Sequence, residues 1–328
     1  MAKKSKRGSG PRPGSNRAER VAARKARAAA TLEPSPRPFA GLAAECDLVA
    51  LRSFVSSATA VLGLIEPGPT WPEPTSVMPD NAPRPAPKPG ERNEVLLATI
   101  LPGAVPAVVR EFRTAPQGVA ATQTDPDPDD VNSALAQSIS WAAHAKIGDE
   151  YAGPAAEFDG TLADVLKADA PLDIIVHDDF SWWFPDGAEV PAEIAPMVER
   201  ASDTVLPTAR LHPKSGVGAP WWVDAGDRAH LRWVRPEAED VLMNALARLH
   251  AAGHLTLGEG SRFAGSFRTH GLLVPVFDLD NEMHHEEWYP GLDQFDAWLA
   301  EALTATSDLT IDERSSRDGL RTRQVTIR

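Results

Sequence analysis

Residues 228–280 constrain the fold of this chain more than any other stretch, because their hydrophobic period changes along the way. Apolar and polar side chains alternate over 229–234, as expected of a half-buried strand. Over 241–249 the apolar residues recur at three- and four-residue spacing, which indicates an amphipathic helix. This helix is expected to have Pro236 in its first turn and to end at Gly253, so the sequence predicts a strand that leads directly into a helix.

Two further strands are predicted after this helix, at 255–257 and 272–279, with a glycine-rich loop between them. A similar strand and helix occur 110 residues earlier, at 119–142. At this offset Val131 aligns with Val241, and acidic residues precede both helices. The repeated order predicts an α+β fold of two related tandem units, each with a helix, antiparallel strands, a helix and strands.

The predicted units run from 39 to 150 and from 151 to 328, and the second ends in a helix and an arginine-rich segment. Residues 66–91 contain nine prolines, a density that no packed element tolerates. Because strand patterns flank this proline-rich segment on both sides, we expect it to be an insertion within the first unit.

Charge is distributed unevenly along the chain, whose net charge is −13. Residues 1–30 carry +9 and the remaining residues −22. We expect residues 1–38 to be a basic, disordered tail with a short helix that places four arginines on one face: Arg17, Arg20, Arg24 and Arg27. Such a face is suited to the phosphates of RNA or of a ribosome. The alternative is a tail that only keeps the chain in solution.

The composition indicates a globular protein, since 42% of the residues are hydrophobic and 24% are charged. No apolar run has the roughly 18–20 residues that would cross a membrane. The basic N-terminus is not followed by an apolar segment, so we expect a cytoplasmic protein. Cys46 is the only cysteine, which excludes an intramolecular disulfide and any site built from several cysteines. We predict no cofactor.

No metal site is predicted either. His250 and His254 have the four-residue spacing of two helical metal ligands, but Gly253 lies between them and is expected to end the helix. His284 and His285 stand beside two glutamates, in a pattern that is more typical of an exposed loop.

The glycine-rich loop is the strongest candidate for a small-ligand site. Its backbone N–H groups are suited to an anion, and nearby basic side chains are suited to pairing with that anion. The candidate residues are Gly258, Gly260, Ser261, Arg262, Arg268 and His270. The alternative is an ordinary turn or bulge between strands.

Tryptophans form a second candidate site. Paired tryptophans on an alternating strand place one ring in the core and one on the surface, where it can contact a peptide or a base. The alternative is that the rings cover the sheet from both sides. These residues are Trp182, Trp183, Trp221, Trp222 and Trp233.

The chain resembles a family of uncharacterised proteins from high-GC, actinobacteria-like bacteria over essentially its whole length. The resemblance rests on KKSKRG with ERVAARKARAAA, PFAGL with ECDLVALR, VDAGDRAHLRWVRPEAEDVLMNALARLHAAG, LGEGSRFAGSFRTHGLLVPVFDL and RDGLRTRQVTIR. It implies no established activity, cofactor or catalytic residue. The element order of the second unit is also similar to that of secretion-chaperone-like domains, a likeness of fold alone.

Two functional hypotheses follow. The first is a non-enzymatic interaction, adaptor or chaperone-like protein whose basic arm binds RNA or the ribosome and whose folded part binds a protein. The alternative is an enzyme of unrecognised type with its site at the loop 258–270. A tryptophan-lined surface without converging polar groups favours the first hypothesis. A polar pocket that joins Arg262, Arg268 and His270 favours the second.

Overall fold

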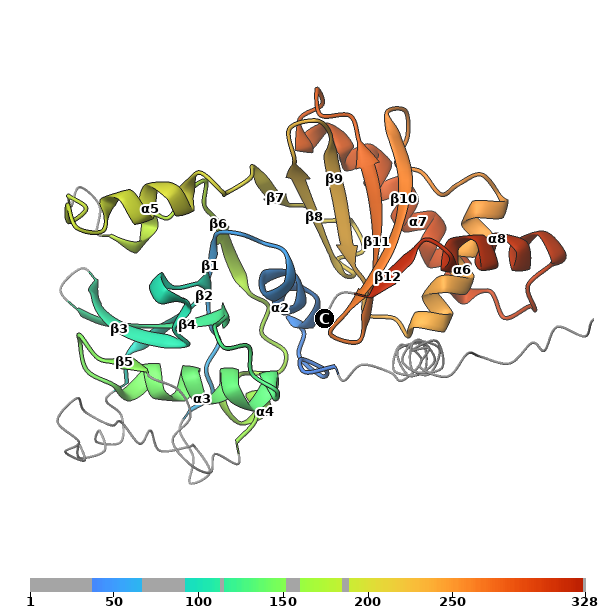
Figure 1. Ribbon diagram of the computed structural model, residues 1–328. Coiled ribbons are helices and arrows are strands. Elements are labelled where there is room, and N and C mark those ends of the chain that lie inside the picture. The colour runs from blue at the N-terminus through green and yellow to red at the C-terminus, as the bar shows by residue number, and fades with distance from the viewer. Residues whose placement is uncertain (1–36, 67–91, 113–114, 152–159, 185–188, 327–328) are drawn as a thin grey trace, which may run out of the picture. The chain divides into compact units, whose positions relative to one another are not determined.

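Two six-stranded sheets, each with helices packed on it, dominate the structure (Figure 1). The computed structural model describes residues 37–66, 92–112, 115–151, 160–184 and 189–326. The α+β class predicted from the sequence is confirmed. The predicted basic tail up to residue 36, and residues 67–91 of the predicted insertion, lie outside the described residues.

The first sheet has the strand order β5-β3-β4-β2-β1-β6. Neighbouring strands are antiparallel except β2 and β4, which are parallel because the chain passes through the 3-10 turn η1 (Pro102–Ala104) and β3 between them. The strands are β1 (Ala58–Val61), β2 (Glu94–Ile100), β3 (Ala107–Phe112), β4 (Ala115–Gln123), β5 (Glu150–Tyr151) and β6 (Asp173–Val176).

Helix α3 (Val131–His144) packs on β4 and β3, with the short α4 (Leu162–Val165) beside it. Its N-terminus is capped by Asp130, whose carboxylate accepts a hydrogen bond from the Ser133 N–H at 3.1 Å. Leu135, Ile139 and Ala142 are buried on one face at helical spacing. The helix predicted from the period of apolar residues is therefore confirmed.

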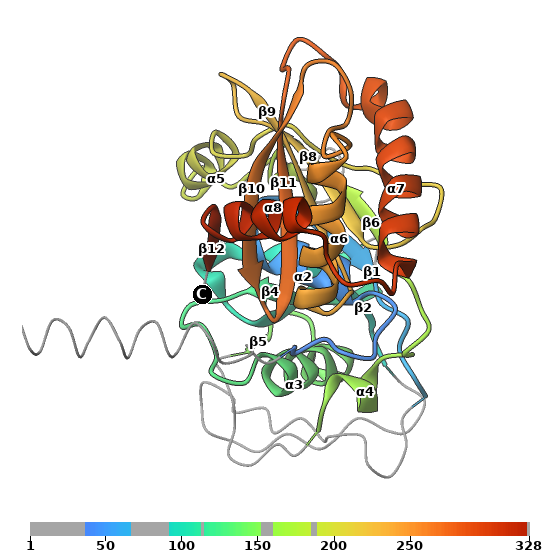
Figure 2. The same ribbon diagram turned by 90° about the vertical axis from the view of Figure 1, so that its right-hand side faces the viewer.

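The second sheet has the order β12-β10-β11-β9-β8-β7 and is antiparallel except where β12 joins β10. Its strands are β7 (Thr208–Arg210), β8 (Ala219–Asp224), β9 (Ala229–Val234), β10 (Ser261–Thr269), β11 (Leu272–Leu279) and β12 (Gln324–Thr326). Figure 2 shows α6 (Glu239–Ala251), α7 (Tyr289–Thr304) and α8 (Ile311–Arg321) gathered in front of this sheet, and the 3-10 turn η3 (His285–Trp288) leads into α7.

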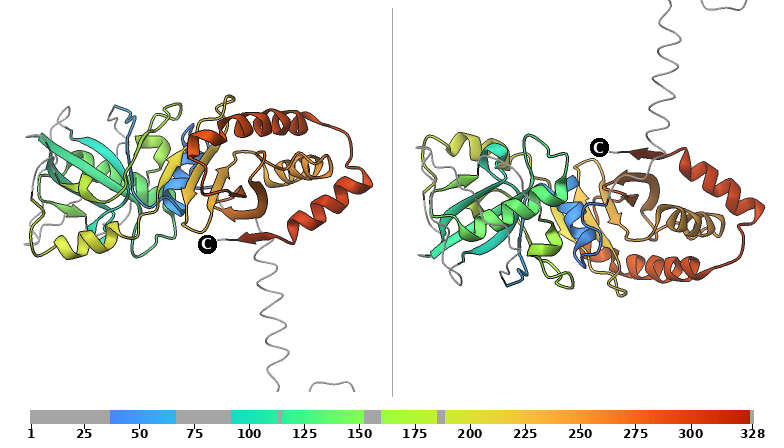
Figure 3. Two further views of the ribbon diagram at one scale, coloured as in Figure 1. Left: turned by 90° about the horizontal axis from the view of Figure 1, so that it is seen from above. Right: turned by 90° about the horizontal axis from the view of Figure 1, so that it is seen from below.

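Helix α2 (Glu45–Ser53) lies between the two sheets, as both views of Figure 3 show. Six of its nine residues are buried, including Leu48, Val49 and Leu51. Its core cluster contains residues of the first sheet, such as Leu97, together with Trp221 of the second sheet. Because its apolar residues are buried against both sheets, α2 depends on both for its stability.

Several segments differ from the sequence-based expectation. Trp182 and Trp183 do not lie on the alternating strand that was expected for paired tryptophans. They belong to the 3-10 turn η2 (Ser181–Trp183), which is followed later by α5 (Ala195–Ser202). The strand predicted at 255–257 is also absent, and most of the predicted glycine-rich loop is strand β10. The glycines of this segment interrupt the alternation of apolar and polar side chains, and Gly265 lies at a register shift against β11.

The two sheets share the step from a strand into a helix but differ in the strands around it. β4 pairs with β2 and β3, which both precede it, whereas β9 pairs with β8 before it and β11 after it. The offset of 110 residues does not align the starts of α3 and α6. Strand β6 also joins the first sheet, beyond residue 150. The order in which the strands pair therefore differs between the two sheets.

Among the helices of the described residues, none combines the length and the apolar character needed to span a bilayer.

Two helical glycines provide a matched test of the packing. A Cβ atom on Gly291, in the first turn of α7, would lie 1.8 Å from the carbonyl oxygen of Leu257. We expect Gly291→Ala to lower the free energy of unfolding by about 3 kcal/mol, because backbone must move to admit the methyl group.

On α8, a Cβ at Gly319 meets nothing within 4 Å. There, alanine should raise the free energy of unfolding by about 0.5–1 kcal/mol. Urea denaturation measures both, and equal effects would contradict the packing described.

Candidate functional site: a tryptophan-lined pocket

A cavity of about 420 Å³ opens beside the first sheet, between η1, η2 and α5. Its walls are mainly apolar, and we call it the tryptophan pocket. The lining residues are Ser56, Ile100, Leu101, Pro102, Gly103, Ala104, Gln123, Phe180, Trp182, Trp183, Met197, Val198, Ala201 and Thr204. Ligand pockets in proteins typically enclose about 300–1,000 Å³, so the cavity has room for several side chains.

Trp182 and Trp183 cover the face of the first sheet opposite α3. They pack against a small cluster of buried residues from β2 and β4 that includes Ala98 and Val119. The two rings meet edge to face, with centroids 5.9 Å apart. Each ring is only partly buried, so the pair both completes the sheet and presents aromatic surface to the pocket.

Polar contacts fix the orientation of Trp182. Its indole Nε1 donates a hydrogen bond to Ser57 Oγ at 3.0 Å, and Ser57 Oγ donates to the carbonyl oxygen of Asp179 at 2.8 Å. The ring of His177 stacks on the indole with centroids 5.4 Å apart. His177 Nε2 also lies 2.9 Å from Thr59 Oγ1, and burial lowers the pKa of this histidine, so its neutral form is favoured.

The guanidinium of Arg110 packs against both tryptophan rings. Its guanidinium lies 4.9 Å from the ring centroid of Trp183 and 5.6 Å from that of Trp182. It donates to the carbonyl oxygen of Trp183 at 2.5 Å and to Gln117 Oε1 at 2.9 Å. Burial lowers the pKa of Arg110 to about 10. Within the described residues no carboxylate pairs with it, so rings and neutral oxygens surround the charge.

The turn η1 forms the floor of the pocket. Gly103 and Ala104 both have positive φ, 71° and 54°, a conformation that costs free energy for alanine. The Ala104 N–H donates to the carbonyl oxygen of Leu101 at 2.8 Å, and the Ala104 carbonyl accepts from the Asp125 N–H at 3.0 Å. These two bonds hold the turn in a shape that leaves the pocket open.

Helix α5 forms the remaining wall and is loosely attached. None of its residues is buried, and Met197, which faces the pocket, is 47% exposed. A helix with so few buried contacts opens at low free-energy cost. The wall can therefore adjust to an occupant.

Acidic residues lie beside the lining residues in the chain. Asp179, Glu199 and Asp203 each adjoin a lining residue, and the backbone of Asp125 is bonded to Ala104. All but Asp179 are exposed, and among the described residues the exposed Arg200 is the one cation that adjoins a lining residue in sequence. The apolar lining is thus interleaved in sequence with exposed acidic residues.

The six residues predicted to bind a small ligand are all described, and they do not share a cavity. Gly258 and Gly260 precede β10 while His270 follows it, so the strand separates them by roughly 25–30 Å. The loop closes on itself through Ser261, whose hydroxyl donates to the Gly258 carbonyl at 2.7 Å and accepts from the Leu257 N–H at 2.8 Å.

The two predicted anion-binding arginines are paired with carboxylates. Arg262 contacts Asp278 at 2.5 Å, and Arg268 contacts Glu239. His270 lies with Gly271 in the hairpin turn between β10 and β11, and its ring packs on Phe39 with centroids 6.0 Å apart. These side chains have structural partners, which corresponds to the alternative of an ordinary turn between strands.

The remaining sequence candidates divide clearly. Trp221, Trp222 and Trp233 are buried in the cores, so among the paired tryptophans only Trp182 and Trp183 reach a pocket. Cys46 is buried in the core, and this burial raises the pKa of its thiol to about 12, so the thiol is unreactive. In the part of the chain that the structure describes, no group of three His, Cys, Asp or Glu side chains is placed to hold a metal ion. Arg17, Arg20, Arg24 and Arg27 lie outside that part.

Sequence reasoning missed most of the tryptophan pocket. The lining residues come from five separate segments, and only the adjacent tryptophans at 182 and 183 gave a signal. Met197 could have been recognised as an exposed apolar residue of an amphipathic helix, but its partner surface could not.

The comparison with known proteins identifies a family whose function is unknown. The sequence model of a family of unknown function, DUF5926, matches residues 38–328. No curated protein and no solved structure matches the chain.

His270 predicts a pH dependence of stability. Burial, with a smaller contribution from the charge of Arg52, lowers its pKa to about 4, whereas an unfolded histidine titrates near 6.5. The unfolded chain therefore binds a proton that the folded chain excludes between these pH values. We expect the free energy of unfolding to fall as pH decreases from about 6.5 to 4.

In the variant His270→Asn, the free energy of unfolding should fall less as the pH decreases, because asparagine does not titrate. Asparagine also tolerates the positive φ of 45° at this position. Urea denaturation of both proteins at pH 7.5, 5.5 and 4.5 measures the difference in slope. Other buried histidines, such as His177, contribute equally to both proteins. Parallel pH profiles would contradict the burial of a neutral His270.

Proposed function

The chain belongs to the family of unknown function DUF5926, and we propose that it is a binding protein. Its tryptophan pocket holds apolar side chains from a basic segment of a partner protein. The observation that carries this proposal is the apolar cavity of about 420 Å³ between Trp182, Trp183 and α5. Exposed aromatic surface of this kind is enriched where proteins bind one another.

The polar groups of the pocket support binding over catalysis. Three lining residues carry polar side chains: Ser56, Gln123 and Thr204. The amide of Gln123 already donates to the carbonyl oxygens of Leu51 at 2.6 Å and Val55 at 2.9 Å. Among the described residues, no carboxylate, imidazole or thiol lines the cavity, so these residues offer no group for proton transfer to a bound molecule.

The charge beside the lining residues supports a basic partner. Asp125, Glu199 and Asp203 are exposed and lie within two residues of lining residues in the chain, within a chain segment of strongly negative charge. Complementary charge around an apolar centre accelerates association and rejects acidic partners. The flexible attachment of α5 supports entry of a side chain as large as leucine or phenylalanine.

A synthetic peptide tests this proposal. The fluorescently labelled peptide acetyl-KLLKLLKLLK-amide should bind the full chain, and the same peptide with glutamate in place of lysine should bind at least about tenfold more weakly. Met197→Gln should weaken the binding of the lysine peptide by about tenfold, because it replaces apolar contact with a polar group of similar size. Fluorescence anisotropy measures each dissociation constant.

The matched control is Ile311→Gln, which changes an exposed apolar residue of α8 that lines no described cavity. This control should bind the lysine peptide like the wild type. Equal losses in both variants, or equal affinity for both peptides, would refute the proposed pocket function. Tighter binding by a full chain with Arg17, Arg20, Arg24 and Arg27 changed to alanine would show that the chain's own arm is the occupant.

The asymmetry of charge supports a second binding function for the basic arm. Residues 1–30 carry +9 against −22 for the rest, so an anionic partner such as RNA or the ribosome is attracted to the arm alone. This function is independent of the tryptophan pocket.

Salt dependence tests the arm. Each phosphate contact to single-stranded RNA contributes about 0.7 to the slope of log affinity against log salt. Changing Arg17, Arg20, Arg24 and Arg27 to alanine should flatten that slope by about three and leave the denaturation midpoint unchanged. Binding of a labelled single-stranded RNA is measured over a salt series. Identical slopes for both proteins would leave the arm without a role in RNA binding.

A further inference from the structure

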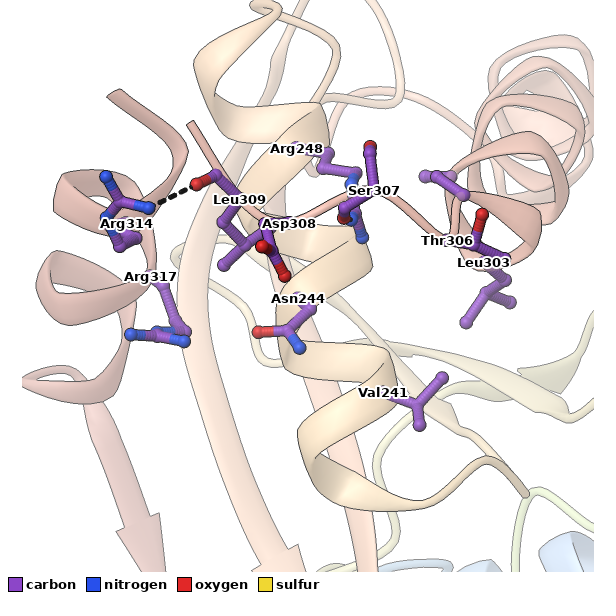
Figure 4. A pocket seen from close by; sticks show the side chains of 12 residues that line it. Val241, Asn244, Arg248, Leu303, Thr306, Ser307, Asp308, Leu309, Arg314 and Arg317 are labelled. Carbon is purple, nitrogen blue, oxygen red and sulfur yellow. Dashed lines mark hydrogen bonds between the residues drawn. The ribbon is translucent and has the colours of Figure 1, made fainter. Parts of the chain in front are cut away.

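A second cavity, of about 460 Å³, lies on the helical layer of the second sheet (Figure 4). It is bounded by α6, by the C-terminal end of α7, by the linker 305–310 and by α8. We call it the arginine groove, and it shares no residue with the tryptophan pocket. Its lining residues are Val241, Asn244, Arg248, Ala302, Leu303, Ala305, Thr306, Ser307, Asp308, Leu309, Arg314 and Arg317.

Three guanidinium groups line this groove from two helices. Arg248 comes from α6, while Arg314 and Arg317 lie one turn apart on α8. Arg248 donates to the carbonyl oxygen of Ser307 at 2.6 Å, and Arg314 donates to that of Leu309, the bond drawn in Figure 4. A guanidinium has five N–H donors, so each of these two retains most of its donors.

The charge of the groove is poorly neutralised. Among the described residues, neither Arg248 nor Arg314 forms an ion pair, although acidic residues outnumber basic ones by 46 to 33 in the chain. Nε of Arg317 is shielded from solvent without a hydrogen-bond partner, and its ion pair with the exposed Asp318 is long, at 3.6 Å. Asp308 is the single acid in the lining, and it is exposed.

Asn244 adds a neutral polar group between the arginines. In Figure 4 its amide lies between Arg317 on one side and the α7 end of the groove on the other. The side chain is half-buried, and no hydrogen bond engages it within the described part of the chain. Beside it, Val241, Leu303 and Leu309 supply apolar surface.

We propose that the arginine groove binds the phosphate group of a small organic phosphate. Arg248, Arg314 and Arg317 contact the phosphate oxygens, and the Asn244 amide donates a further hydrogen bond. Three guanidinium groups stand against two exposed carboxylates, Asp308 in the lining and Asp318 beside Arg317, so positive charge remains in excess for an oxyanion. The forked guanidinium matches the geometry of a phosphate. The cavity is several times larger than a phosphate ion, so the organic group lies against Val241 and Leu303.

Phenyl phosphate and benzoate are the probes, because they share a ring and differ in the anionic group. Isothermal titration calorimetry of the full chain at pH 8, with sodium chloride keeping the ionic strength constant, should show tighter binding of phenyl phosphate. Arg317→Gln and, separately, Arg248→Gln should each weaken that binding by at least about tenfold. Arg323→Gln, an exposed arginine outside the lining, should bind like the wild type.

Each other outcome overturns the proposal. Equal affinity of wild type and Arg317→Gln with an unchanged denaturation midpoint would place the phosphate elsewhere, and an equal loss in Arg323→Gln would show general attraction to positive charge. Tighter binding of benzoate would exclude phosphate as the recognised group. Because Met197→Gln leaves the arginine groove unchanged, failure here is distinguishable from failure of the tryptophan pocket.

Discussion

The structure depends on the burial of helix α2 between the two sheets. Leu48, Val49 and Leu51 are all but inaccessible to solvent, and neither sheet alone could enclose them. Each buried leucine or valine contributes about 1.5–3 kcal/mol through removal of apolar surface from water. Polar contacts then fix the orientation, since Asp47 of α2 pairs with Arg210 of β7 at 2.6 Å. The two sheets are therefore held together by one shared core, rather than by a contact between finished domains.

The end of α2 also positions the tryptophan pocket. The last helical turn leaves carbonyl groups without helical partners, and the Leu51 carbonyl accepts from the side chains of Thr122 and Gln123 at the end of β4. Ser57, a few residues later, accepts from the indole of Trp182. A helix required by the core thus positions Gln123 and Trp182 in the pocket lining. This explains why a surface cavity is built from residues far apart in sequence.

Local patterns predicted the helices well, because each carries its own signals: the apolar period of α3, or the capping box between Thr310 and Glu313 of α8. Strand β10 was missed because its glycine at 265 interrupts the alternation. The His270–Gly271 pair, with φ of 45° and 73°, is a two-residue hairpin turn that lacks the usual asparagine. The candidate sites could not be predicted, since Met197 and Trp183, or Arg248 and Arg317, meet only after the chain has folded.

Arg110 and the arginines of the groove differ in what surrounds their charge. Arg110 is buried without a carboxylate, yet two aromatic rings, a glutamine and backbone carbonyls surround it, so its charge is stabilised in place. Arg248 and Arg314 have no such enclosure and line the arginine groove, where among the described residues Arg317 has only the exposed Asp318 as an ion-pair partner, at 3.6 Å. Carboxylates are abundant in this acidic chain, and several are exposed elsewhere on its surface. The absence of an ion pair to Arg248 within the described residues therefore reflects the arrangement of α6 and α8, which leaves positive charge directed at the solvent side of the groove.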